Sequence, residues 1–333
     1  MESKNSTKSI VEAGLMAALV VVLMFLNAYV PVIGYIGMMI LPLPITLLVV
    51  RHNVKVALGA VIASSIIIAF IMSPISAIAS LLLYGLVGLT LGFCIKSKKS
   101  PVFSVAAQGI AIITGTVASI ALTIYVMMNT TLYKFIEGMV DTMKESMNAA
   151  MSIYTSMGID PSSNPFVKSM EMLNVETLIL MIPGVIIIYA FFMAYINYII
   201  TRSIFKKMKI YMENFPPFAR WYLDNRITAL VIIIACIGII LASMGVNIGQ
   251  NIYIGSIYLL QMVFLIIGIS AVTYMLRERF NVPKGLVIVI IAFTITGFER
   301  FYAMIGLVDS IMDLRRIDPH SLRNAIEKRF AKK

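Results

Sequence analysis

Eight long apolar runs occupy most of this 333-residue chain, and they constrain its fold more than any other feature. An apolar run of 18 or more residues can cross a hydrocarbon layer of roughly 30 Å as a helix. Inside that layer only helices and closed barrels satisfy their backbone hydrogen bonds. Because these runs are continuous rather than alternating in polarity, we expect helices. The sequence predicts an all-α, polytopic integral membrane protein with eight transmembrane helices followed by a short carboxy-terminal hairpin.

The overall composition supports the same class, because 60% of the residues are hydrophobic and only 13% are charged. A water-soluble domain carries about twice that charged fraction. The predicted spans cover residues 10–30, 33–50, 55–72, 76–95, 101–127, 175–201, 227–246 and 252–275. Pro42 and Pro44 lie inside the second run, so we expect that span to be kinked or to start late.

The basic residues between the spans predict the orientation. If the amino terminus is cytoplasmic, 23 of the 27 Lys and Arg residues fall on the cytoplasmic side. The opposite-side segment 128–174 carries only Lys134, Lys144 and Lys168. Cytoplasmic loops are enriched in Lys and Arg, so this asymmetry predicts a multi-pass membrane protein with both termini in the cytoplasm.

The region after Lys284 can be interpreted in two ways. Residues 286–296 and 301–312 are apolar pieces, each too short to span a membrane, and Gly297–Arg300 separates them. A single ninth span would place the basic tail outside, against the charge rule. A hairpin that returns to the cytoplasmic side obeys this rule and is the favoured interpretation, with Glu299 and Arg300 near its apex.

These features divide the chain into four parts. Residues 1–201 form a six-span domain that includes the external segment 128–174, whose apolar residues from Leu132 to Met147 follow an amphipathic helical pattern. Residues 202–226 are an amphipathic cytoplasmic linker, 227–316 a two-span unit with the hairpin, and 317–333 a basic cytoplasmic tail.

The sequence lacks the motifs of several common enzyme classes. It contains no G-x-x-x-x-G-K-[ST] phosphate loop, no H-E-x-x-H helix and no G-x-S-x-G elbow. We therefore expect neither an enzyme, nor a cofactor, nor a metal site. The net charge of +11 is better explained by cytoplasmic loops beside anionic lipid than by a nucleic-acid partner.

Polar groups at membrane depth are costly, so each is a candidate for function. Glu299 and Arg300 have two possible explanations. They lie between short helices, as charged groups do at the interrupted helices of transporters, or they lie at a hairpin tip and are simply hydrated. Together with Asn27 and Tyr35 they are the candidate ligand or coupling residues. Neutral amides such as Gln108 and Asn197 are more often explained by hydrogen bonds between helices.

Two further groups are candidate partner interfaces. Ala13 and Ala17 give the first span a flat face, which serves either a partner or packing inside the bundle. Asp309 and Asp313 are four residues apart, and we expect them to pair with Arg315 and its neighbour in an exposed last turn rather than to act as a catalytic pair.

Four stretches resemble a known family. They look like the corresponding parts of the YybS-like predicted membrane proteins of Firmicutes. The four stretches are Val11–Leu15, Leu41–Pro44 followed by Val49–His52, the Phe-Pro-Pro-Phe and Trp of 215–222, and the closing Gly306–Arg316. The resemblance covers essentially the whole chain, and the family has no agreed activity.

The first part of the chain is in turn similar to the substrate-binding S components of energy-coupling-factor transporters. That likeness implies an outward-facing ligand pocket near the loop after the first span and the segment 128–174. It also implies that Ala13 and Ala17 contact a coupling membrane subunit.

The sequence thus favours a membrane solute-binding or transport subunit for a small molecule, energised by separate ATPase and coupling subunits. One alternative is a scaffold or regulator that transports nothing and docks partners through Gly306–Arg316. Another is a stand-alone ion-coupled transporter that uses Glu299.

Overall fold

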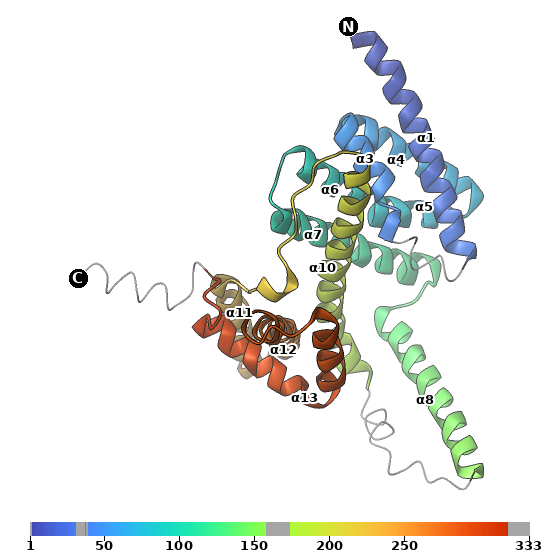
Figure 1. Cartoon of the computed structure of the whole chain (residues 1–333). Coiled ribbons are helices and arrows are strands. Elements are labelled where there is room, and N and C mark those ends of the chain that lie inside the picture. The colour runs from blue at the N-terminus through green and yellow to red at the C-terminus, as the bar shows by residue number, and fades with distance from the viewer. Residues whose placement is uncertain (1, 31–36, 38, 158–173, 319–333) are drawn as a thin grey trace. The chain divides into compact units, whose positions relative to one another are not determined.

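The structure is a computed structural model that describes residues 2–30, 37, 39–157 and 174–318 (Figure 1). All regular structure in these residues is helical, which confirms the all-α membrane protein predicted from the sequence. The chain divides into two compact units. Unit 1 comprises Met1–Ile179 and Ile186–Phe215, and unit 2 comprises Leu180–Val185 and Pro216–Lys333. The division after residue 215 falls within the segment predicted to be a linker.

The helices that begin in unit 1 follow the predicted apolar runs. They are α1 (Glu2–Tyr29), α3 (Leu43–Arg51), α4 (Val54–Ile71), α5 (Pro74–Ser80), η1 (Leu81–Gly85), α6 (Leu86–Lys96), α7 (Pro101–Ala121), η2 (Leu122–Met127), α8 (Leu132–Ser156) and α10 (Val175–Lys207). The predicted amphipathic helix of the segment 128–174 is therefore formed, as α8. The turn expected at residues 160–165 lies outside the described residues.

Between residues 216 and 318, unit 2 contains three long helices and two shorter helical turns. They are η4 (Phe218–Arg220), α11 (Asn225–Ser243), α12 (Asn247–Tyr274), η5 (Met275–Arg279) and α13 (Lys284–Met312). Residues 208–217 of the predicted linker form no helix, while its first residues continue α10 as far as Lys207.

The helix starts are encoded locally. Asn53, Ser73, Ser100 and Asn174 each accept a hydrogen bond at their side-chain oxygen from a backbone N–H of the helix that follows. These caps satisfy amide donors that the first helical turn leaves without a partner. The caps place the turns between spans close to where the sequence predicts them.

Seven described helices are long and apolar enough to cross a membrane, or eight if the bent α13 is counted as one span. The second predicted span, 33–50, differs from the observed helix, because α3 has only 9 residues and starts at Leu43. A helix of that length is about 14 Å long, too short to cross alone. The late start agrees with the prolines at 42 and 44, and residues 31–36 and 38 lie outside the described residues.

The carboxy-terminal helix α13 is broken where the hairpin apex was predicted. Its two halves, Lys284–Ile295 and Gly297–Met312, are bent by 110°. Phe298 has non-helical angles of φ −124° and ψ 26°. The charged pair Glu299 and Arg300 follows this break directly and is exposed.

Unit 1 has its core on both sides of the short helix α3. One cluster joins α1, α3 and α4 around Leu41, Ile45 and Leu48, and the other joins α6, α7 and α10 around Leu91 and Phe205. The outer faces of the long helices carry exposed apolar side chains, for example Phe70 on α4. An apolar exterior of this kind is stable in lipid and not in water.

Candidate functional site

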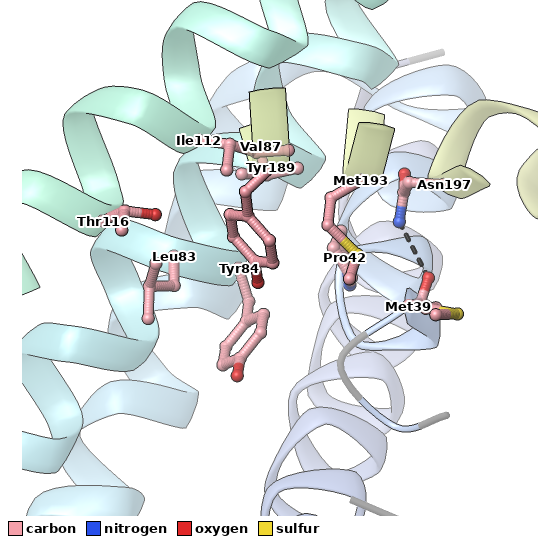
Figure 2. A pocket seen from close by; sticks show the side chains of 10 residues that line it. All are labelled: Met39, Pro42, Leu83, Tyr84, Val87, Ile112, Thr116, Tyr189, Met193 and Asn197. Atoms are coloured by element: carbon pink, nitrogen blue, oxygen red, sulfur yellow. Dashed lines mark hydrogen bonds between the residues drawn. The ribbon is translucent and has the colours of Figure 1, made fainter. Parts of the chain in front are cut away.

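A cavity of about 90 Å³ lies inside unit 1, between the start of α3 and the helices η1, α6, α7 and α10. Its polar lining residues are Tyr84, Thr116, Tyr189 and Asn197, and its apolar lining residues are Met39, Pro42, Leu83, Val87, Ile112 and Met193. Figure 2 shows the two tyrosine rings near its middle, with Thr116 on one side and Met193 on the other.

Glycines let the cavity-lining helices approach one another closely. A Cβ atom on Gly88 of α6 would lie 2.6 Å from the Pro42 carbonyl oxygen, and one on Gly115 of α7 would lie 2.6 Å from the Leu82 carbonyl oxygen. Both distances are shorter than real Cβ contacts allow. These glycines therefore set the spacing of the elements that carry Val87, Thr116 and Tyr84.

Tyr84 and Leu83 belong to a single π-helical turn, η1, between α5 and α6. Such a turn inserts an extra residue into a helix and changes the direction in which its side chains point. It is frequent at functional sites. Here it aims Tyr84 into the cavity from a helix that otherwise packs through Gly85 and Gly88.

A pair of buried amides closes one side of the cavity. Gln108 Nε2 on α7 donates to Asn197 Oδ1 on α10 at 2.8 Å, and Asn197 Nδ2 donates to the Met39 carbonyl oxygen at 2.8 Å. The predicted interhelical role of these amides is confirmed. The network fixes α7, α10 and the chain before α3 relative to one another.

The cavity is uncharged and mostly apolar, with a few polar groups in its wall. None of the ten lining residues, all within the described part of the chain, carries a charge. Thr116 Oγ1 is buried and has no hydrogen-bond partner among the described residues. A site with these groups can bind a small molecule through hydroxyl and aromatic contacts but offers no acid or base.

Of the four predicted ligand residues, Asn27 belongs to unit 1, and Glu299 and Arg300 belong to unit 2. Asn27 is partly buried in unit 1, and its Oδ1 has no partner among the described residues. Tyr35 lies outside the described residues. Glu299 and Arg300 are exposed at the break of α13 in unit 2. Asn27, which is described and lies in unit 1, does not line the cavity.

The small-residue face of α1 packs inside unit 1, which is the second of the two roles expected for it. Ala17 is only 2% exposed and packs in the cluster shared by α1, α3 and α4, with Ala13 partly buried against the same cluster. Small residues permit this close approach of α1 to α4. The outward face of α1 instead carries Leu15, Leu19 and Val22.

A buried polar cluster lies at the end of α13 in unit 2. Asp309 and Asp313 are each 4% exposed and Arg315 is 7% exposed, so the expectation of an exposed last turn is wrong. Arg315 Nε and Nη2 donate to Asp309 Oδ2 at 3.0 and 2.7 Å. This burial could not be predicted, because charged groups at a basic helix end are normally solvated.

Arg315 also anchors the linker. Its Nη1 donates to the Ala219 carbonyl oxygen and to Ser270 Oγ, both at 2.8 Å, and its Nη2 donates to the Trp221 carbonyl oxygen at 2.7 Å. Five hydrogen bonds use every donor of the guanidinium group. We name Asp309, Ser270 and Arg315, with the carbonyls of Ala219 and Trp221, the Arg315 cluster.

Acidic groups surround the Arg315 cluster. Asp313 adopts a left-handed φ of 48°, and its Oδ1 accepts hydrogen bonds from the amides of Ile317 at 2.7 Å and Asp318 at 3.3 Å. Burial, followed by the nearby carboxylates of Asp318, Asp224 and Asp313, raises the pKa of the Tyr222 phenol above its usual value. Because Asp313 is engaged in capping this turn, its geometry fits a structural role.

One ion-pair group was not anticipated from the sequence. Glu12 of α1 accepts hydrogen bonds from Arg51 Nη1 at 2.5 Å and lies 2.8 Å from His52 Nε2. Lys96 donates to the His52 carbonyl oxygen. The only signal in the sequence was that Glu12 is a lone acidic residue at the start of an apolar run. In the structure, Glu12 joins α1 to the turn after α3.

Fold and site together define a polytopic all-α membrane protein with a small uncharged cavity in its first unit. The chain belongs to the family described as predicted membrane protein (DUF2232), which matches residues 18–310. It is 21% identical over 319 residues to the uncharacterized protein YybS of Bacillus subtilis (strain 168), a match that covers 93% of this chain and 98% of that protein. No solved structure matches the chain.

Proposed function

We propose that this chain is a membrane solute-binding or transport subunit for a small molecule. The observation that carries the proposal is the cavity of unit 1, where three spanning segments place aromatic and hydroxyl groups around about 90 Å³ of space. Membrane helices pack densely, so an internal space that leaves the Thr116 hydroxyl without a partner has a cost that a bound solute would offset. The absence of a phosphate loop from the sequence supports separate ATPase and coupling subunits as the energy source, with no enzymatic activity in this chain.

A thermal-shift screen tests this proposal. We expect at least one member of a panel of nucleobases, vitamins, amino acids and sugars to raise the unfolding temperature of the purified protein in detergent. A ligand present at a hundred times its Kd adds about 2.7 kcal/mol, which corresponds to roughly 5–10 °C.

Adjacent residues of α10 provide matched controls for the screen. Met193→Trp fills the cavity and should abolish the shift, whereas Phe192→Trp, at an exposed position, should retain it. A panel in which no compound raises the unfolding temperature would remove the basis of the proposal. Mild detergent extraction followed by recovery of ATPase subunits would test the proposed energy source.

We also propose that both termini lie in the cytoplasm of a bacterial cell. Alkaline phosphatase fused after Ser156 should then be active, and green fluorescent protein fused after Lys207 should fluoresce, because each reporter works on one side only. The charge asymmetry of 23 to 4 supports this orientation. An inactive phosphatase together with a fluorescent fusion at Ser156 would reverse it.

The two alternatives draw less support. A scaffold that docks partners through Gly306–Arg316 could not use Asp309, Asp313 and Arg315, because these three residues are buried. A stand-alone ion-coupled transporter draws support from the break in α13 beside Glu299. It would be favoured if the purified chain alone drove uptake into liposomes.

A further inference from the structure

The lining of the unit 1 cavity restricts the charge of its ligand. No lining residue is charged, and the one amide side chain in the wall, Asn197, already bonds to Gln108 and to the Met39 carbonyl. An ion transferred into such a site would lose its hydration without gaining a counter-charge, which is strongly unfavourable. The cavity therefore selects against carboxylates, phosphates and ammonium ions.

Three hydroxyl groups remain available to a ligand. Thr116 Oγ1 is buried without a partner, and neither the Tyr84 nor the Tyr189 hydroxyl makes a hydrogen bond to another described residue. A hydroxyl both donates and accepts, so these groups match a ligand that offers donors and acceptors of its own. A pure hydrocarbon would leave the buried Thr116 hydroxyl without a hydrogen bond.

Shape and size restrict the ligand further. The rings of Tyr84 and Tyr189 and the thioethers of Met39 and Met193 favour a flat, unsaturated partner. A cavity of roughly 150 Å³ accepts benzene. The cavity here, of about 90 Å³, therefore fits no more than one small ring.

We infer that the unit 1 cavity binds an uncharged, planar nitrogen heterocycle of about one ring, held by the hydroxyls of Thr116, Tyr84 and Tyr189. This inference rests on the proposed function and names the class of solute. Neutral heterocycles of this kind carry ring N–H and carbonyl or imine groups, which supply the donors and acceptors that the three hydroxyls require.

Matched pairs of probes test the class of ligand. Uracil and its 6-carboxylate, orotate, differ by one charge, as do pyrazole-4-carboxamide and pyrazole-4-carboxylate. Thermal shift and equilibrium binding on the full-length protein in detergent should detect at least one neutral probe, with its carboxylate partner bound at least tenfold more weakly.

Variants that remove a hydroxyl and preserve the shape test the site. Thr116→Val and Tyr84→Phe should each weaken binding of the neutral probe by about three- to tenfold, the effect of one lost hydrogen bond. Thr114→Val, at an exposed position two residues away on α7, should leave binding unchanged. Unfolding temperatures of the unliganded variants check that each has folded.

Each of the remaining outcomes would overturn one specific claim: the ligand class, the assignment to this cavity, or the proposed function. If the carboxylates bind better than the neutral probes, the inferred class is wrong and the solute-binding function stands. If neutral probes bind equally to wild type, Thr116→Val and Tyr84→Phe, the assignment to this cavity is wrong. If no heterocycle binds while another compound of the wider panel does, only the class fails, and if nothing binds at all, the proposed function fails with it.

Discussion

Replacing Arg315 with methionine is expected to destabilise unit 2 by about 3–5 kcal/mol. The side chains of Arg315 and Asp309 are each only 3% exposed, so the substitution leaves the Asp309 carboxylate buried without its counter-charge. It also removes the donors to the carbonyls of Ala219 and Trp221. The unfolding temperature of the purified protein should fall, and the emission of Trp221, the only tryptophan of the chain, should shift to the red as the linker is released.

The neighbouring residue supplies a matched control for this prediction. Arg316 is exposed, so Arg316→Met makes the same chemical change and should alter stability by less than about 0.5 kcal/mol. The double variant Asp309→Leu/Arg315→Met should recover part of the loss, because a buried ion pair can be replaced by apolar groups at little cost. Equal unfolding temperatures and equal Trp221 spectra for Arg315→Met and Arg316→Met would show that the Arg315 cluster does not hold the linker.

The second large effect is expected at the crossing of α12 and α13. A Cβ atom on Gly268 would lie 1.8 Å from the Tyr302 carbonyl oxygen, and one on Gly306 would lie 1.9 Å from the Phe264 carbonyl oxygen. The backbones are in direct contact there, so no side-chain movement can accommodate a methyl group. Gly268→Ala should force the helices apart and cost about 3 kcal/mol, measured as a loss of unfolding temperature in detergent.

Gly285 on α13 provides the control for the crossing. Its Cβ position has open space around it, so Gly285→Ala should leave stability unchanged or raise it by up to about 1 kcal/mol through helix propensity. If Gly268→Ala unfolds at the same temperature as Gly285→Ala, the close approach of α12 and α13 does not contribute to the stability of unit 2.

Much of the fold could be predicted because lipid imposes simple rules. Length and hydropathy identified the spans, and the prolines indicated the late start of α3. The interruption between two short apolar pieces predicted the break at Gly297–Arg300. That Gln108 and Asn197 make hydrogen bonds between helices followed from the cost of an amide at membrane depth, although their partners did not. Each of these properties depends on a local segment of the chain or on one polar group that is costly to bury in the membrane.

The site and the Arg315 cluster could not be found in the same way. Tyr84, Thr116 and Tyr189 are ordinary residues of three separate apolar segments, and no spacing links them. Arg315 lies in a basic stretch that would be solvated at most helix ends. Its burial depends on the carbonyls of Ala219 and Trp221, which lie more than 90 residues earlier in the chain.

By itself, therefore, the sequence determined the environment, the helical class and the approximate ends of most spans. Only the tertiary structure decided which faces meet, where Ala17 points, and which hydroxyls share a cavity. The physical reason is that lipid tails are as apolar as a protein core. A spanning helix is consequently apolar on every side, and hydropathy does not distinguish the face that packs from the face that contacts lipid.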